Sequence, residues 1–180
     1  MILTAFRRLR QDRNIHALYG AIVAQARLPA FYAAYGVPDT VEGRFELIVL
    51  HLVLFLNRLA QGAAAAAAGQ QLFDVFCRDL DHNLREMGVS DPAVPRKMRD
   101  FGEAFYGRQA AYRAALAASQ GEELEKAFSR NIFAVGGVDN RAVRLARYAR
   151  ALIERLAIES EDELLAGKAV FPSPEAFFHA

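Results

Sequence analysis

The chain has 180 residues, a formal net charge of +1 and 53% hydrophobic residues. This length fits one domain that buries a full hydrophobic core, and the balanced charge argues against a protein that coats nucleic acid over its whole surface. The single cysteine, Cys77, cannot form an internal disulfide, which favours a reducing compartment.

The N-terminal segment, residues 1–13, is basic and reads MILTAFRRLRQDR. Its short apolar stretch precedes its arginines, whereas a secretory signal has the reverse order and a longer apolar core, so we expect no export signal. We separate this basic segment from a single helical domain over residues 14–180. Its arginines fit contact with RNA or an anionic membrane as well as simple solvation; they are Arg7, Arg8, Arg10 and Arg13.

Hydrophobic periodicity in the first part of the domain predicts three helices and no strand. Asn14 is a plausible N-cap for a helix that ends before Pro29. A short helix then begins at Pro29 and stops at Gly36. We expect Asp39 to cap the third helix, with Glu42 three residues later completing a capping box.

The third helix carries the longest apolar run of the chain, LIVLHLVLFL over residues 47–56. Ten residues are too few to span a bilayer, and a helix that is apolar nearly all round belongs at the centre of a bundle. The alanine-rich stretch 61–70 follows. Alanine favours helix, but Gly62 and Gly69 bracket the run, so we expect a connector there.

The second half of the chain predicts further helices, an acidic turn and a tail. Ser160 and Glu163 suit a second capping box in the acidic turn. The tail VFPSPEAFFHA is expected to pack as an extended strap, because an exposed aromatic tail is an aggregation hazard or a binding element. The sequence thus predicts an all-α, single-domain bundle of about six to seven helices with a short extended C-terminal tail. Its later helices are expected over 70–87 (ending at Gly88), 95–119, 122–133 and 141–158.

The stretch DLDHNLREMGVSD, residues 79–91, has the appearance of a metal site. Asp79, Asp81 and Asn83 match the first three ligands of a calcium-binding EF-hand loop. The loop then requires a glycine and, at its twelfth position, a glutamate, but Leu84 and Ser90 occupy these places. The spacing therefore excludes an EF-hand.

A shared divalent ion between the two aspartates is also disfavoured. Residues two apart on a helix point about 200° from each other, so Asp79 and Asp81 fall on opposite flanks of an apolar stripe. Asp81 instead precedes Arg85 by four residues, the favourable order for a helical ion pair. The stripe consists of Leu72, Phe73, Phe76, Cys77, Leu80, Leu84 and Met87.

No catalytic constellation is present in the sequence. The four histidines, His16, His51, His82 and His179, are scattered and have no zinc or haem-attachment spacing. We interpret His51, inside the apolar run, as a core histidine hydrogen-bonded to a neighbour. Two features point to binding. Helix 141–158 carries arginines and is either solvated or docked to RNA or an anionic membrane. Gly102 and Gly107 predict close backbone approach, to another helix by default or otherwise to a partner.

Several stretches in the same order resemble the ubiquinol–cytochrome c chaperone family, the assembly factors for cytochrome b of the bc1 complex. The resemblance is clearest from about Leu18 to Leu116. It is carried by LYGAIVAQAR, FYAAYGVPDTVEGRFELIVLH, LFDVFCRDLDHNLREMGVSD, KMRDFGEAFYGRQAAY and, more loosely, RNIF.

This resemblance implies a non-enzymatic helical chaperone without a cofactor. Mitochondrial members act with a small partner near the ribosomal tunnel exit, bind newly made cytochrome b while haem is inserted, and pass it to the growing complex. We expect a bacterial member, cytoplasmic and peripheral to the inner membrane, with no specific nucleic-acid partner. A small co-chaperone and the ribosome are further expected partners. The alternative is a helical carrier or enzyme for an apolar or haem-like ligand that uses His51.

The matching motifs also supply candidate contacts for a protein partner. We expect these residues to form a surface together. The alternatives are that Arg44 pairs internally and that Asp91 caps the helix after Pro92. The candidates are Tyr19, Arg27, Tyr32, Arg44, Asp79, Asp81, Arg85, Asp91, Lys97, Met98, Tyr106 and Arg108.

Overall fold

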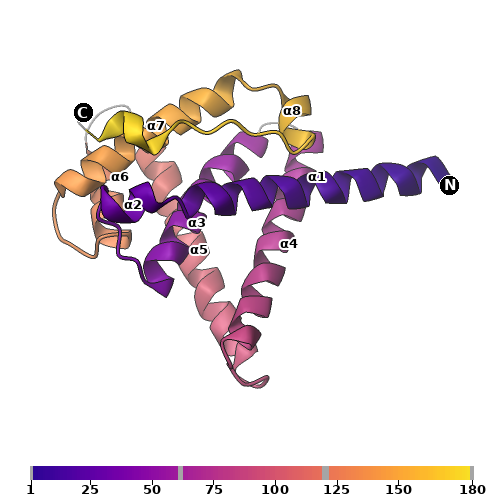
Figure 1. Cartoon of the computed structure of the whole chain (residues 1–180), viewed down its shortest axis with the longest axis horizontal. Helices are drawn as coiled ribbons and strands as arrows, with labels where there is room; N and C mark the ends of the chain where they lie inside the picture. The colour runs from indigo at the N-terminus through magenta and orange to yellow at the C-terminus, as the bar shows by residue number, and fades with distance from the viewer. Residues whose placement is uncertain (1, 61–62, 119–121, 179–180) are drawn as a thin grey trace.

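The computed structural model describes residues 2–60, 63–118 and 122–178, and within these ranges the chain is all-α, as predicted. Figure 1 shows its helices gathered around α3. The elements are α1 (Ile2–Ala26), α2 (Pro29–Ala33), α3 (Val41–Leu59), α4 (Ala63–Glu86), α5 (Val94–Ala117), α6 (Glu123–Asn131), α7 (Asn140–Ile158), α8 (Glu161–Leu165) and a 3₁₀ turn, η1 (Pro174–Phe177).

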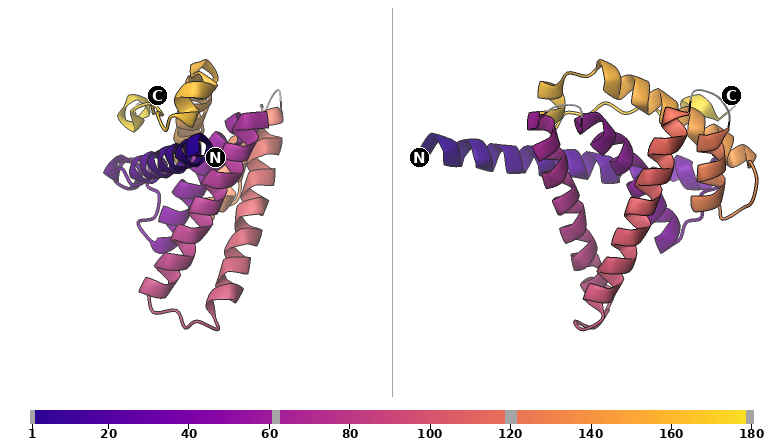
Figure 2. Two further views of the ribbon diagram at one scale, coloured as in Figure 1. Left: turned by 90° about the vertical axis from the view of Figure 1, so that its right-hand side faces the viewer. Right: turned by 180° about the vertical axis from the view of Figure 1, so that it is seen from behind.

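Helix α3 forms the centre of the bundle, as its apolar run predicts. Residues 46–55 are all buried, and α3 packs against α1, α4, α5 and α7. Helices α4 and α5 form a hairpin that narrows to a turn near Gly88, which has φ +81° (Figures 1 and 2). Helix α1 packs across both α3 and α4 and so covers one side of the bundle.

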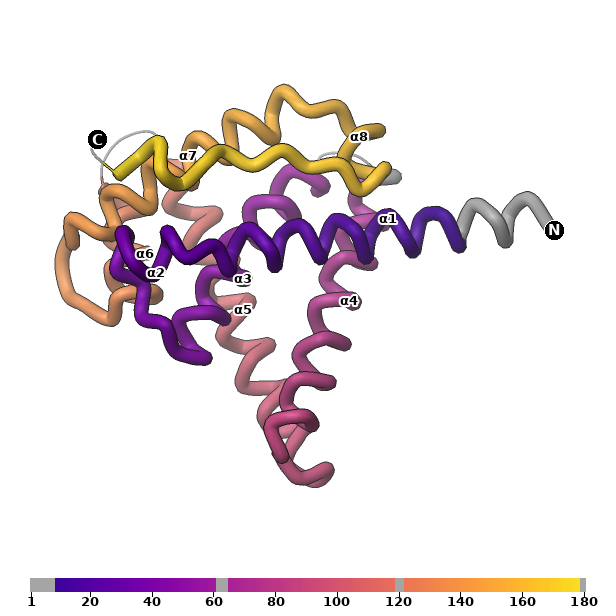
Figure 3. The backbone as a smooth tube through the Cα atoms, viewed as in Figure 1, coloured from indigo at the N-terminus to yellow at the C-terminus, as the bar shows by residue number. Residues whose placement is uncertain are grey.

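The C-terminal tail packs as a strap. After α8 it runs back beside α7 and reaches α2 through η1 (Figure 3). The hydroxyl of Tyr35 donates to the carbonyl of Pro174 at 2.8 Å, and the rings of Phe171, Phe177 and Phe178 pack on the core. The capping box of Ser160 and Glu163 is present at the start of α8.

Four local predictions are wrong. Helix α1 starts at Ile2 rather than at Asn14, because residues 2–13 contain no glycine or proline to end a helix. Asn14 instead donates from Nδ2 to the carbonyl of Leu165 at 3.0 Å. The alanine tract is helical from Ala63, and Gly69 lies inside α4, so the strong helix propensity of alanine outweighs the glycine.

The third and fourth errors concern the start of α3 and the glycines of α5. Thr40 is the N-cap, with its Oγ1 accepting from the Gly43 amide at 3.1 Å, whereas Asp39 pairs with Arg44. Gly102 and Gly107 have nothing within 4 Å of an added Cβ, so no close helix packing explains them. Predictions that fall outside the described residues or side chains concern Arg7, Arg8, Gly62, Ser119 and His179.

Candidate partner-binding groove

An apolar groove of about 200 Å³ opens between α1, α3, α4 and α5. Two of its edge residues are unusually exposed for apolar side chains: Val41 is 57% exposed and Met87 is 55% exposed. Exposed apolar residues that adjoin an apolar hollow are characteristic of binding sites. The groove is lined by Tyr19, Arg27, Val41, Arg44, Phe45, Ile48, Phe76, Asp79, Leu80, Asn83, Met87 and Phe101.

Three phenylalanines from three helices form the floor of the groove. The ring of Phe45 on α3 lies 4.8 Å from that of Phe101 on α5 and 6.3 Å from that of Phe76 on α4, centroid to centroid. Such aromatic contacts fix the positions of the three helices relative to one another. The floor is therefore an apolar surface to which three helices contribute.

The α1–α4 side of the groove is polar. The hydroxyl of Tyr19 donates to Oδ2 of Asp79 at 2.7 Å, and Nδ2 of Asn83 donates to the backbone carbonyl of Asp79 at 2.7 Å. Burial raises the pKa of Tyr19 well above its ordinary value, and the hydrogen bond to Asp79 raises it further. Tyr19 thus remains a neutral donor at physiological pH.

Arg27 and Arg44 form the cationic edge of the groove. Nε of Arg44 donates to Oδ1 of Asp39 at 2.7 Å, which lowers the pKa of that exposed carboxyl. Within the described residues the side chain of Arg27 has no hydrogen bond or ion pair. Both arginines also line a neighbouring hollow of about 470 Å³. Tyr32 lines this hollow too, and its hydroxyl donates to the carbonyl of Ala26 at 3.0 Å.

Five of the twelve predicted contact residues therefore lie together, Tyr19, Arg27, Arg44 and Asp79 in the groove and Tyr32 beside it. The apolar lining is absent from the predicted contact residues. The sequence predicts Phe76, Leu80 and Met87 on one apolar stripe, but Met87 lies beyond the last turn of α4 and is exposed. No sequence signal distinguishes groove phenylalanines from core phenylalanines, because both follow the same helical period.

A second group of candidates lies at the tip of the α4–α5 hairpin, outside the groove lining. Arg85 pairs with Asp81 at 2.8 Å, the ion pair predicted from their spacing, and with Asp91 at 2.5 Å. Asp91 does not cap α5, which starts at Val94 with no side-chain cap. These three exposed charges therefore pair with one another near the tip of the hairpin.

The remaining four candidates lie on α5 and do not line the groove. Lys97 is exposed and Met98 half-buried near the start of the helix. Tyr106 is 58% exposed, and its ring lies 5.9 Å from that of Phe73. Arg108 points inward: Nη2 donates to Oε1 of buried Glu46 at 2.5 Å, so this arginine is an internal ion-pair partner.

His51 is the core histidine that the sequence predicts. It is fully buried, Nδ1 lies 2.7 Å from the carbonyl of Leu47, and Nε2 lies 2.8 Å from the hydroxyl of Tyr148. A carbonyl can only accept, so Nδ1 carries the proton and Nε2 accepts from Tyr148. Because both nitrogens are occupied, neither is free to bind haem iron, and burial lowers the pKa of His51 to about 4.

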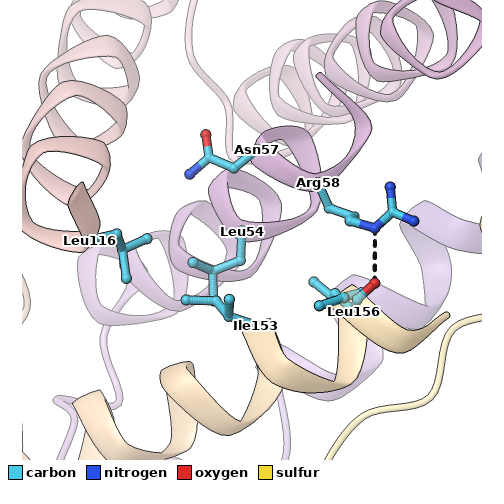
Figure 4. Close-up of a pocket in the computed structure, with 7 residues that line it drawn as sticks. Leu54, Asn57, Arg58, Leu116, Ile153 and Leu156 are labelled. Carbon is cyan, nitrogen blue, oxygen red and sulfur yellow. Dashed lines mark hydrogen bonds between the residues drawn. The ribbon is translucent and has the colours of Figure 1, made fainter. Parts of the chain in front are cut away.

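Another hollow, of about 290 Å³, opens between α3, α5 and α7 and is lined by Leu54, Leu116 and Ile153 among others (Figure 4). The guanidinium of Arg58 points away to the end of α7, where Nε donates to the carbonyl of Leu156 at 2.9 Å. This arginine satisfies carbonyls that α7 leaves unpaired at its C-terminus. Arg58, which also lines the hollow, therefore caps the end of α7.

The described residues contain no group of three or more side chains suited to hold a metal ion. In the same ranges, no helix combines the length and hydrophobicity needed to cross a lipid bilayer. The fold is that of an all-α protein that carries an apolar groove with an arginine edge on its surface.

Comparison with known proteins assigns the family. The family model described as "Ubiquinol-cytochrome C chaperone" matches residues 33–171, and the chain belongs to this family. The "Ubiquinol-cytochrome-c reductase complex assembly factor 1" of Xenopus laevis is 26% identical over 157 residues, which span 86% of this chain and 78% of that protein. The sequence resemblance is thus confirmed, and the family is one of chaperones rather than enzymes.

A solved structure supports the same assignment. The crystal structure of the Cbp3 homolog from Brucella abortus superimposes with a TM-score of 0.87 at 37% sequence identity. The match covers 98% of this chain and 99% of the other. The whole fold, including the α4–α5 hairpin that borders the groove, is therefore that of a relative with clear sequence similarity.

Proposed function

We propose that this protein binds newly made cytochrome b through the apolar groove and assists assembly of the ubiquinol–cytochrome c reductase complex, working beside the membrane as a peripheral protein. The Xenopus relative is named as an assembly factor of that complex, which supports the same complex as the destination here. The observation that carries the proposal is the groove itself, with its phenylalanine floor and exposed edge residues Val41 and Met87. That a small co-chaperone and the ribosome are further partners stays a prediction.

The physical argument concerns the apolar helices of a membrane protein. Until such a helix is packed with its neighbours, its apolar face needs shielding, and each Å² removed from water contributes about 25 cal/mol. A groove between helices receives an amphipathic or apolar helix at positions spaced by three or four residues. Phe45, Phe76 and Phe101 come from three different helices, so a bound segment would contact all three at once.

The test uses substitutions at the groove edge. Val41→Asp and Met87→Asp place a charge beside the apolar floor but change side chains that are already more than half exposed, so the fold is expected to tolerate them. Ile158→Asp is the matched control, because Ile158 is 74% exposed on α7 and does not line the groove. Tagged variants would replace the wild-type protein in a strain that depends on the bc1 complex.

Two quantities would be measured: cytochrome b recovered with the tagged protein from solubilised membranes, and the amount of mature bc1 complex. Both are expected to fall for the Val41 and Met87 variants, with cytochrome b transcript unchanged, and to stay at wild-type level for Ile158→Asp. Normal cytochrome b recovery with the double variant Val41→Asp/Met87→Asp would rule out the groove as the binding site. Normal complex levels in a deletion strain would rule out the function.

A further inference from the structure

We infer that the edge formed by Arg27 and Arg44 makes the groove selective for an apolar helical segment whose flank carries carboxylates. The inference rests on the proposed function of the groove and adds the chemistry of the bound segment. An uncharged apolar segment would use the phenylalanine floor alone. An acid-flanked segment would use the floor and the arginines together.

The position of the two arginines favours contact with the flank of a bound segment. Arg27 and Arg44 line both the apolar groove and the neighbouring hollow, so they stand where the two meet. Arg27 directly follows α1, whereas Arg44 lies in the first turn of α3. A bound helix that lies on the phenylalanine floor and runs toward this edge would therefore meet the guanidinium groups of Arg27 and Arg44 where the apolar surface ends. The hollow beyond them, of about 470 Å³, has room for the flanking residues.

The positive charge of this edge also favours a carboxylate. The acidic residues that line the groove and the hollow are Asp39 and Asp79. Oδ2 of Asp79 already accepts the hydroxyl of Tyr19, and Oδ1 of Asp39 accepts from Nε of Arg44. Within the described residues Arg27 has no such partner. The edge thus keeps positive charge next to an apolar floor, and an incoming carboxylate complements it with charge-assisted hydrogen bonds.

An internal role for Arg27 is excluded. Two other arginines pair with buried carboxylates on neighbouring helices: half-buried Arg108 pairs with Glu46, and exposed Arg150 pairs with Glu125 through two hydrogen bonds. Arg27 is exposed and has neither arrangement among the described residues. Its charge is therefore available to a ligand.

The experiment uses the absence of tryptophan from this chain. A helical peptide of leucine and alanine with one tryptophan can be titrated with the purified full-length protein while only the peptide's tryptophan fluorescence is followed. Three versions would be compared, with a Glu–Asp flank, a Gln–Asn flank and a Lys–Lys flank. The acidic peptide is expected to bind about three- to tenfold more tightly than the neutral one, with the difference shrinking as salt is raised.

Substitutions in the protein sharpen the test. Arg27→Gln with Arg44→Gln should abolish the preference for the acidic peptide and leave the neutral peptide's Kd unchanged, whereas Arg147→Gln on α7, an exposed arginine outside the groove, should change neither. Asp39→Asn removes the carboxylate that competes for Arg44, so it should tighten binding of the acidic peptide only. Circular dichroism would confirm that the variants fold.

The outcomes separate the two proposals. Equal binding of the acidic and neutral peptides, or a preference that survives Arg27→Gln/Arg44→Gln, would overturn selection by carboxylates while leaving the groove as a binding site. No binding of any peptide would count against the groove itself. Loss of the acidic peptide on addition of phosphatidylglycerol vesicles, with the protein moving onto the vesicles, would assign the arginines to lipid headgroups instead and overturn the inference.

Discussion

The hydroxyl of Tyr19 donates a 2.7 Å hydrogen bond to Oδ2 of Asp79 and so joins α1 to α4 across 60 positions of sequence. The two residues lie on one side of the apolar groove, where Asn83 also donates to the backbone carbonyl of Asp79. The width of the groove depends on the spacing of α1 and α4, and this hydrogen bond holds the two helices together. Asp79 therefore has a structural partner although it lines a binding surface.

Removing that hydrogen bond should loosen the groove. Tyr19→Phe keeps the buried ring and loses the hydroxyl, which leaves Oδ2 of Asp79 without its donor, so the free energy of unfolding should fall by about 1 kcal/mol. Urea denaturation measures this change. Tyr106→Phe is the control, because Tyr106 is 58% exposed, and it should leave stability unchanged. Equal effects of both substitutions would contradict the assigned role of the bond.

The buried histidine predicts a dependence of stability on pH. Burial lowers the pKa of His51 in the folded protein to about 4, below the value of about 6.5 expected in the unfolded chain. The unfolded state therefore binds the proton more readily, and stability is lost as pH falls from about 6.5 to about 4. The loss attributable to His51 is on the order of 3 kcal/mol.

A variant isolates this contribution. His51→Gln cannot titrate, so its stability relative to wild type should improve steadily between about pH 7 and about pH 4.5, although it is less stable at neutral pH because the hydrogen bonds to Leu47 and Tyr148 are altered. Urea midpoints at several pH values give the comparison. Parallel pH profiles for the two proteins would show that another group is responsible.

The pair Glu46–Arg108 predicts a loss of stability when the arginine is removed. Glu46 is 6% exposed, so Arg108→Met would leave a buried carboxylate without its partner and lower the free energy of unfolding by about 3 kcal/mol. The double variant Glu46→Leu/Arg108→Met removes both charges and should recover most of that loss. Both variants should still bind the acid-flanked peptide, since neither residue lines the groove.

The same site has a second, pH-dependent consequence. Burial already raises the pKa of Glu46 above its ordinary value, against the opposing effect of Arg108, and removing the arginine should raise it further. A folded state with a raised carboxyl pKa gains stability as pH falls through that pKa, until the unfolded carboxyl also binds its proton near 4.5. The deficit of Arg108→Met should therefore shrink in mild acid, and a deficit that grew there would contradict the assignment.

Two glycines should respond to alanine in opposite directions. A Cβ at Gly43 would lie 1.9 Å from the carbonyl oxygen of Pro38, so Gly43→Ala should displace the start of α3 and destabilise the protein by about 2 kcal/mol or more. Gly107 in α5 has nothing within 4 Å of an added Cβ, so Gly107→Ala should stabilise the helix by up to about 1 kcal/mol. Thermal unfolding of the two variants tests both signs.

Much of the helical framework was predictable because it depends on local chemistry. The apolar run 47–56 identified the central helix, the spacing of Asp81 and Arg85 identified their ion pair, and Ser160 with Glu163 identified a capping box. The mistakes were also local. At the start of α3, Thr40 and Asp39 are both good caps, and only the backbone shows that Thr40 has that role.

The functions of the individual arginines were not predictable from sequence. Arg27, Arg44 and Arg108 occur in motifs of similar character, but one is an exposed groove residue, one pairs with Asp39, and one pairs with buried Glu46. Whether an arginine forms an internal ion pair or stays available to a ligand depends on which carboxylates the other helices bring near it. That depends on distances between helices, which the pattern along one helix does not contain.

The sequence by itself determined that this chain forms helices, which of them is buried on all sides, and which family it resembles, because propensity, capping and periodicity act over a few residues. Only the tertiary structure brought Tyr19, Phe45, Asp79 and Phe101 to one groove. Their positions span more than eighty residues of chain, and it is the packing of α1, α4 and α5 around α3 that makes them neighbours.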